Sequence, residues 1–107
     1  MDLLKKDFYF LDDKYQVLSN YNVENKMHFR NFIVTKNLEP FIMFDVAIYE
    51  NIAEKYEFSP SVLLLEVGIK IFNQMLQENN FSFSRGFISE HYPDLSAVNW
   101  QILTKGY

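Results

Sequence analysis

The most strongly patterned part of the chain runs from Phe58 to Asn80, FSPSVLLLEVGIKIFNQMLQENN. Its polar positions between residues 66 and 77 follow at steps of four, three, one and three, which draws one narrow stripe along a helix. Apolar side chains fill the rest of the circumference, whereas a strand would alternate apolar and polar positions. Ser59 is a good N-cap residue, and Pro60 suits the first helical position. The pattern predicts a helix over residues 60–79, packed on several sides.

The same pattern predicts which positions of this helix are covered. We expect six residues to be buried, namely Leu64, Leu65, Gly68, Ile69, Phe72 and Met75. We expect the polar stripe to face solvent, namely Glu66, Lys70, Asn73 and Gln77. Glycine lowers helix stability, so Gly68 in the middle of the apolar side indicates the close approach of another element.

Ahead of this helix the pattern is typical of strands. Residues 15–21 (YQVLSNY) and 27–36 (MHFRNFIVTK) are rich in β-branched and aromatic side chains, and the polar segment between them can turn. A second polar segment leads into residues 41–44 (FIMF), and Pro40 suits the beginning of a strand. The simplest assembly is an antiparallel meander of these three strands.

Asp45 decides where the third predicted strand ends. In a helix running from Phe41 to Tyr56, its carboxylate would lie on the apolar side, where an unpaired charge is costly. As a helix N-cap, the carboxylate would instead accept backbone N–H bonds. We therefore expect a helix over residues 46–57 that follows directly after Asp45.

The two ends of the chain carry weaker patterns. Residues 2–11 suit either a helix capped by Asp2 or an aromatic-rich strand, and we favour the helix. Near the other end, Pro93 precedes a predicted helix over residues 94–104. The expected fold class is α+β, with a small N-terminal antiparallel β-meander packed on C-terminal helices. We expect a single compact domain over residues 1–107.

Composition supports a folded domain and excludes several kinds of chemistry. Hydrophobic residues make up 49% and charged residues 22% of the 107 residues, which is ordinary for one globular domain. The absence of cysteine excludes disulfides and zinc–thiolate sites. Asp7 and the pair Asp12–Asp13 interrupt the N-terminal apolar run that a signal peptide would need. No apolar stretch is long enough to span a bilayer, so we expect a cytoplasmic protein without a membrane partner.

The charge disfavours nucleic acid as a partner. Ten basic and 14 acidic side chains give a formal net charge of −4, and the longest basic run is Lys5–Lys6. The segment IAEKYEFSPS and the residues after it, from Ile52 to about Glu66, nevertheless faintly resemble ribbon-helix-helix and helix-turn-helix repressors. Val62 and Leu65 depart from that resemblance, because these proteins tend to have polar residues there. The resemblance implies a dimeric DNA-binding transcriptional regulator as the alternative function.

Signals for catalysis are weak. The chain has neither the Gly-x-Ser-x-Gly nucleophile elbow nor a phosphate-binding glycine loop. Glu90, His91 and Asp94 carry metal-ligand atoms, but their spacing matches no recognised site, and a solvated helix end explains them better. We expect no enzymatic activity, no cofactor and no metal.

Two groups of residues are candidates for contact with a partner. The first is the group of C-terminal aromatic residues, of which Trp100 is the best candidate, with Phe83, Phe87, Tyr92 and Tyr107. Tryptophan and tyrosine are enriched at binding hot spots, although for the group as a whole we favour rings that close the core over the long helix. The second group consists of Glu50, Glu54 and Glu57, which suit a basic protein surface.

These observations together favour a non-enzymatic protein-binding module. Small acidic inhibitors, immunity proteins, antitoxins and phage-type modulators have this kind of composition. The expected partner is another protein with a basic surface, and the sequence is also compatible with a homodimer.

Overall fold

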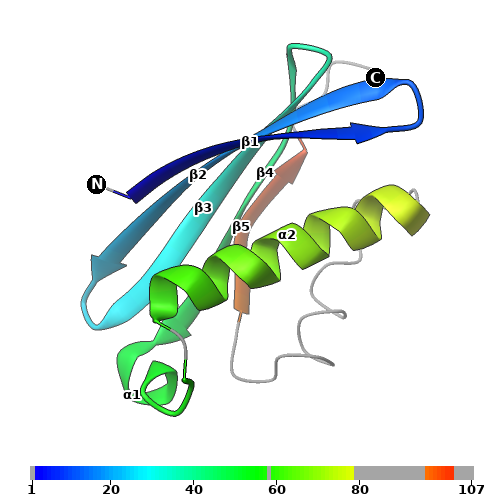
Figure 1. Ribbon diagram of the computed structural model, residues 1–107. Coiled ribbons are helices and arrows are strands. Elements are labelled where there is room, and N and C mark those ends of the chain that lie inside the picture. Colours follow the sequence, from blue (N-terminus) through cyan, green and yellow to red (C-terminus); the bar gives the residue numbers. More distant parts are fainter. Residues whose placement is uncertain (1, 58, 79–95, 103–107) are drawn as a thin grey trace.

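The computed structural model is a five-stranded antiparallel sheet with one long helix across one face (Figure 1). It describes residues 2–57, 59–78 and 96–102, with the backbone alone described for residues 2, 3 and 96–102. The strands are β1 (Asp2–Phe10), β2 (Asp13–Glu24), β3 (Met27–Lys36), β4 (Glu39–Tyr49) and β5 (Ser96–Ile102), and they lie side by side in that order. The helices are α1 (Glu50–Ala53) and α2 (Pro60–Glu78). The predicted α+β class with an N-terminal antiparallel meander is confirmed.

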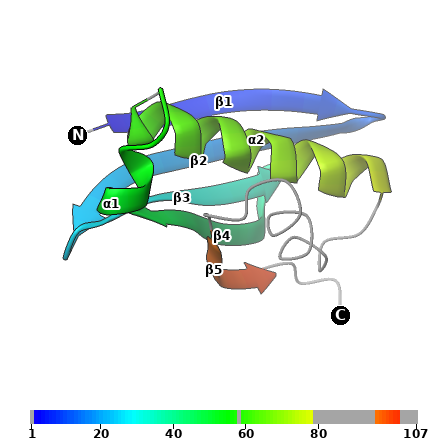
Figure 2. The same ribbon diagram turned by 90° about the horizontal axis from the view of Figure 1, so that it is seen from below.

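Side chains that face α2 alternate with side chains that face away from it along the central strands, and the first set forms the core. The strands turn one set of side chains toward α2, including Tyr15, Val17, Phe32, Val34, Ile42, Phe44, Val46 and Ile48, and all of these are buried. The helix lies across this face of the sheet (Figure 2). It contributes Leu63, Leu64, Val67, Gly68, Ile71, Phe72, Met75 and Leu76.

The long helix agrees closely with its prediction. It begins at Pro60, and the Ser59 hydroxyl accepts a hydrogen bond from the Val62 N–H at 3.3 Å, as an N-cap does. The four residues of the predicted polar stripe are all exposed. Among the residues predicted to be buried, Leu65 and Ile69 are only half-buried, because the sheet covers the helix on one side and these two lie at its margin.

Gly68 lies directly against β3. A Cβ atom at this position would overlap the ring of Phe32, so only glycine allows the ring to rest on the helix backbone. Phe32 in turn stacks on Phe44 of β4, with ring centroids 4.9 Å apart. The prediction that Gly68 admits the close approach of another element is therefore confirmed.

A buried arginine fastens the N-terminal end of α2 to the same strand. Arg30 is 1% exposed, and its guanidinium donates hydrogen bonds to Ser61 Oγ at 2.8 Å and to the Ser61 carbonyl at 3.3 Å. It also donates to Ser19 Oγ of β2 at 3.1 Å. Hydrogen bonds to a charged donor are stronger than neutral ones, so this cluster fixes where the helix begins on the sheet.

The prediction of Asp45 as a helix cap is wrong. Strand β4 continues through Asp45 to Tyr49, and α1 has only four residues in place of the predicted helix over residues 46–57. Phe44 and Val46 point into the core, so Asp45 between them points away from α2 and is half-buried rather than enclosed. The strand therefore places the carboxylate away from the apolar core without any helix cap.

Two further predicted helices are strands. Residues 2–10 form β1, which pairs along its whole length with β2, so the helical preference for residues 2–11 is wrong. Residues 96–102 form β5 on the free edge of β4, where a helix over residues 94–104 was expected. In both cases pairing with a neighbouring strand satisfies a row of backbone groups, which outweighs a weak local preference for helix.

Three tight turns connect the first four strands. In the β2–β3 turn, Asn25 and Lys26 have φ values of 52° and 63°, and in the β3–β4 turn Asn37 and Leu38 have 50° and 72°. Positive φ at both central positions is the pattern of type I′ hairpins. Leu11 in the β1–β2 turn has a φ of 55°. This conformation costs a side chain other than glycine or asparagine roughly 1–2 kcal/mol.

We expect Gly68→Ala to destabilise the protein by about 1–2 kcal/mol. The overlap with Phe32 should cost roughly 1–3 kcal/mol, which exceeds the gain of about 1 kcal/mol in helix propensity. Urea unfolding followed by circular dichroism measures the change. Asn73→Ala, at an exposed position of the same helix, is the control and should shift the free energy of unfolding by less than about 0.5 kcal/mol. A Gly68→Ala protein more stable than the wild type would contradict the contact.

Candidate partner-binding face

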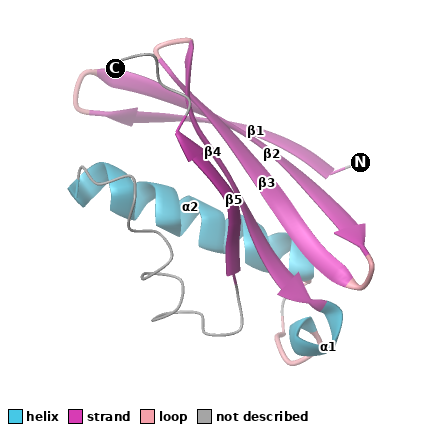
Figure 3. Ribbon diagram, turned by 180° about the vertical axis from the view of Figure 1, so that it is seen from behind, coloured by secondary structure: helices cyan, strands magenta, loops and turns pink. Residues whose placement is uncertain are grey.

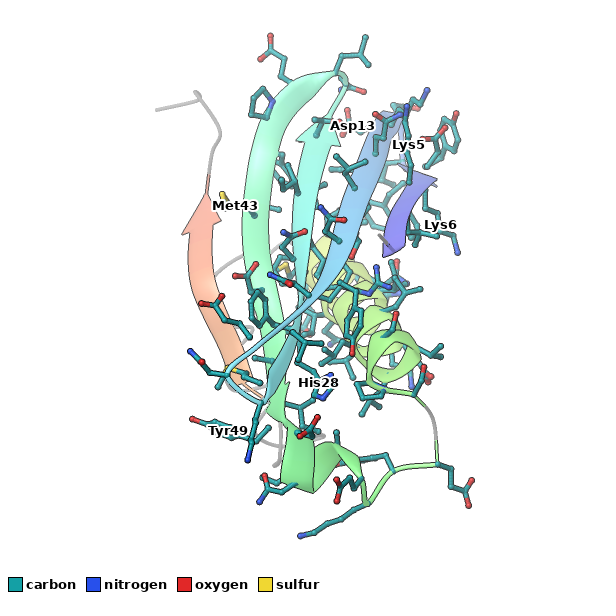
Figure 4. The ribbon with its side chains drawn as sticks, turned by 90° about the vertical axis from the view of Figure 1, so that its left-hand side faces the viewer. Lys5, Lys6, Asp13, His28, Met43 and Tyr49 are labelled. Carbon is teal, nitrogen blue, oxygen red and sulfur yellow. The ribbon has the colours of Figure 1, made fainter. Side chains whose placement is uncertain are left out.

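The sheet has a second face, opposite α2, which we call the outer face. Figure 3 looks onto this side, and no described element lies across it. Leu18, Ile33 and Met43 are paired in register across β2, β3 and β4, so their side chains form one row on this face. Leu18 is 37% and Ile33 39% exposed. Figure 4 labels Met43 on β4, at one end of this row, and Lys5 on β1, which is in register with Leu18.

A second apolar pair lies further along the strands. Phe29 of β3 is in register with Ala47 of β4, and Asn22 of β2 is opposite Phe29. Phe29 is half-buried, while Ala47 is buried beneath its neighbours. The row and this pair together form the apolar band, which we define as Leu18, Phe29, Ile33, Met43 and Ala47.

A row of polar residues lies between the two parts of the apolar band. Asn20, Asn31 and Asp45 are in register across β2, β3 and β4. The backbone N–H of Asn20 donates to Asn31 Oδ1 at 3.0 Å, whereas the buried Oδ1 of Asn20 accepts no hydrogen bond from the described residues. A pocket of about 410 Å³ opens here, lined by Asn20, Tyr21, Asn22, Phe29 and Asn31.

Charged side chains border the outer face along β1. Lys14 Nζ lies 3.8 Å from Asp7 Oδ2, and Gln16 Nε2 donates to Asp7 Oδ1 at 3.2 Å. An apolar centre with polar groups at its margin is the usual composition of a protein–protein interface.

A separate polar cluster joins α1 to the sheet. The Tyr21 hydroxyl lies 2.6 Å from His28 Nδ1, and His28 Nε2 lies 3.5 Å from Glu50 Oε1. His28, Glu50 and Glu54 line a pocket of about 300 Å³ together with Ala53, Tyr56 and Pro60. Within the described residues, no group of three or more histidine, aspartate or glutamate side chains is placed to hold a metal ion. The contact between His28 and Glu50 ties the short helix to β3.

The predicted site residues fall into two sets. Glu50, Glu54 and Glu57 are all exposed, but only Glu50 belongs to a helix, so they do not form the acidic helix face that was expected. The backbone of Trp100 belongs to β5, at the irregular part of its pairing with β4, and its side chain lies outside the described residues. The other four aromatic residues also lie outside the described residues, namely Phe83, Phe87, Tyr92 and Tyr107.

Sequence reasoning missed the outer face. The available signal was the unbroken apolar run Phe32–Ile33–Val34, because a strand with one solvated face alternates apolar and polar residues. Two members of that run point into the core, so the third must point away from it.

Comparison with family models, with curated proteins and with solved structures finds no significant match to this chain. Within the part of the chain that the structure describes, no helix is both long enough and apolar enough to cross a membrane.

Alanine substitution of one isoleucine on each face of the sheet should distinguish the face that α2 covers from the outer face. Ile42→Ala should lower the free energy of unfolding by about 2–5 kcal/mol, because Ile42 is buried beneath α2. Ile33→Ala should lose only about 1 kcal/mol, because much of that side chain is already in water. Urea unfolding of both variants measures the difference. Equal losses would mean that Ile33 is covered in the folded protein.

Proposed function

We propose that the protein is a non-enzymatic protein-binding module whose partner covers the outer face of the sheet. The observation that carries the proposal is the row of Leu18, Ile33 and Met43 at the centre of the sheet, in which Leu18 and Ile33 are exposed to solvent and Met43 is half-buried. An antiparallel sheet with one solvated face normally presents polar residues there. A contiguous exposed apolar area on a folded domain is typical of an interaction site.

The dimensions of this face support the same proposal. With about 4.8 Å between strands and about 3.3 Å per residue, five strands of roughly ten residues present on the order of 800 Å². Each partner in a standard protein–protein interface buries about 800 Å². One partner of ordinary size can therefore cover the whole outer face.

The chemistry of the partner follows from the residues on and around this face. We infer a protein with an apolar patch and with basic groups to complement the net charge of −4. Small inhibitors, immunity proteins, antitoxins and phage-type modulators work by occupying another protein in this way. We also propose that it acts in the cytoplasm, a reducing compartment with which a chain without cysteine is compatible.

The alternative, a dimeric DNA-binding regulator, has less support. Its resemblance required a first helix through Tyr56, whereas α1 ends at Ala53, and α2 turns its apolar side to the sheet. We expect no affinity for duplex DNA tighter than about 10⁻⁵ M at physiological salt, because an acidic chain releases few counterions. Fluorescence anisotropy titration with a labelled duplex measures this. Tight binding that weakens steeply with salt would favour the regulator.

A charge in the centre of the apolar band should abolish partner binding. Ile33→Glu buries a carboxylate against the partner, which should weaken binding by 2 kcal/mol or more, about thirtyfold. The readout is quantitative mass spectrometry of proteins captured from the native host by wild type and variant. The thermal midpoint should stay within about 8 °C of wild type, which corresponds to roughly 1 kcal/mol for a domain of this size.

Asn73→Glu is the matched control, since Asn73 is exposed on α2, on the opposite side of the sheet from the outer face. It should retain the captured partner. If Ile33→Glu also retained it while Trp100→Ala lost it, the contact would lie at the C-terminal aromatic residues, and the outer face would be excluded.

A further inference from the structure

Two leucines stand at the tips of neighbouring hairpins. Leu11 in the β1–β2 turn is 85% exposed, and Leu38 in the β3–β4 turn is 81% exposed. Both turns lie at the same end of the sheet, away from the β2–β3 turn and α1 (Figure 1). Both leucines have positive φ, a conformation that favours glycine or asparagine.

The opposite end of the sheet shows that the turn itself does not require leucine. The β2–β3 turn has the same sign of φ at its two central positions, and there the chain places the polar residues Asn25 and Lys26. Lys26 therefore occupies the position that Leu38 occupies in the β3–β4 turn. Backbone strain together with full exposure of an aliphatic side chain is most often retained at a site of contact.

Hydrogen bonds hold the Leu38 turn in place. The side chain of Asn37 donates to Asp13 Oδ1 at 2.8 Å and accepts from the Lys14 N–H at 2.9 Å. The backbone N–H of Asn37 donates to the Lys14 carbonyl at 2.8 Å. Leu38 is therefore presented on a braced turn, which lowers the entropy lost when it is covered.

A small pocket lies at the same end, between the β1–β2 turn and the end of α2. It measures about 330 Å³, and its lining combines Phe10, Leu11, Tyr15 and Leu76 with the polar residues Asp13, Lys36 and Gln77. This volume is at the small end of the range for ligand sites, so a side chain suits it better than a drug-sized molecule. Burial raises the pKa of the Tyr15 hydroxyl above its usual value.

Lys36 supplies positive charge beside this pocket. Its Nζ lies 3.7 Å from Asp13 Oδ2 and remains 40% exposed. Glu39, directly after Leu38, is exposed and has no ion-pair partner among the described residues. The end of the sheet thus carries an apolar projection followed by a negative charge, and a partly apolar pocket whose polar side holds the Lys36–Asp13 ion pair.

We propose that this end of the sheet binds a second copy of the chain, with Leu38 of each copy entering the pocket beside Leu11 of the other. A projection and a matching pocket on one surface are what a two-fold interface requires, because each copy then provides both. Glu39 of one copy meets Lys36 of its partner at the edge of the contact. The contact leaves the outer face of both copies free, so it does not depend on the proposed function.

Analytical ultracentrifugation of the full chain over roughly 1–1,000 µM tests the proposal. The average mass should rise from 12.8 kDa toward twice that value with increasing concentration, as a small interface predicts. Leu38→Asn, which suits the positive φ, should fold normally by circular dichroism and raise the dissociation constant at least tenfold. Lys26→Asn, which introduces asparagine at the equivalent position of the β2–β3 turn, should leave the dissociation constant unchanged. Should Leu38→Asn fail to fold, Leu38→Gly takes its place.

A charge exchange tests the pairing of Glu39 with Lys36. Glu39→Lys and Lys36→Glu should each weaken association, and the double variant should restore most of it. A chain that remains monomeric at all concentrations would overturn the proposal, as would a dimer insensitive to Leu38→Asn. A dimer lost in Ile33→Glu but retained in Leu38→Asn would instead assign self-association to the outer face.

Discussion

The contact between Phe32 and Gly68 determines how the two layers of the molecule meet. The ring of Phe32 rests on the backbone of α2 because the helix has no side chain at that point. Phe44 stacks on a face of the same ring, whose tip meets Gly68, so this one ring joins β3, β4 and α2. Arg30, two residues earlier on β3, fixes the beginning of the helix through Ser61. Both contacts are made by residues of β3, so this strand positions α2 on the sheet.

This arrangement leaves the sheet with two unlike faces. The single long helix covers the side that holds Phe32 and Val34, and no described element covers the side that holds Ile33. A sheet of five strands is wider than one helix, so the helix alone cannot protect both faces. The exposure of the aliphatic residues on the outer face therefore follows from the arrangement of the layers. It is also the clearest support for the proposed partner.

Much of the fold could be predicted from periodicity. The long helix was predictable because its polar stripe and its Ser59–Pro60 start agree, and β3 because its residues favour strands and are flanked by turns. Asp45 could not be placed in the same way. Asp45 is half-buried on the outer face of the sheet. Reasoning from this residue alone considers only a carboxylate buried on the apolar side of a helix or a carboxylate that caps a helix. The alternation of Phe44, Val46 and Ile48 around it was the stronger signal.

The ends of the chain were misjudged for a different reason. Residues 2–10 and 96–102 become strands because β2 and β4 offer unpaired edges, and those edges are a property of the assembled sheet. The candidate site has the same limitation. Whether Leu18 or Val17 faces solvent depends on which side α2 occupies, and the local sequence does not determine that side.

The order of the strands has a consequence for how the protein is made. Strands β1 to β4 pair with one another in sequence order through short turns, and such local contacts form quickly. During synthesis from the N-terminus, these four strands can pair before α2 exists. Until residue 78 has left the ribosome, the face that holds Phe32 and Phe44 is as bare as the outer face. The nascent sheet is then apolar on both sides, which is the stage most prone to aggregation and the one at which a chaperone would bind.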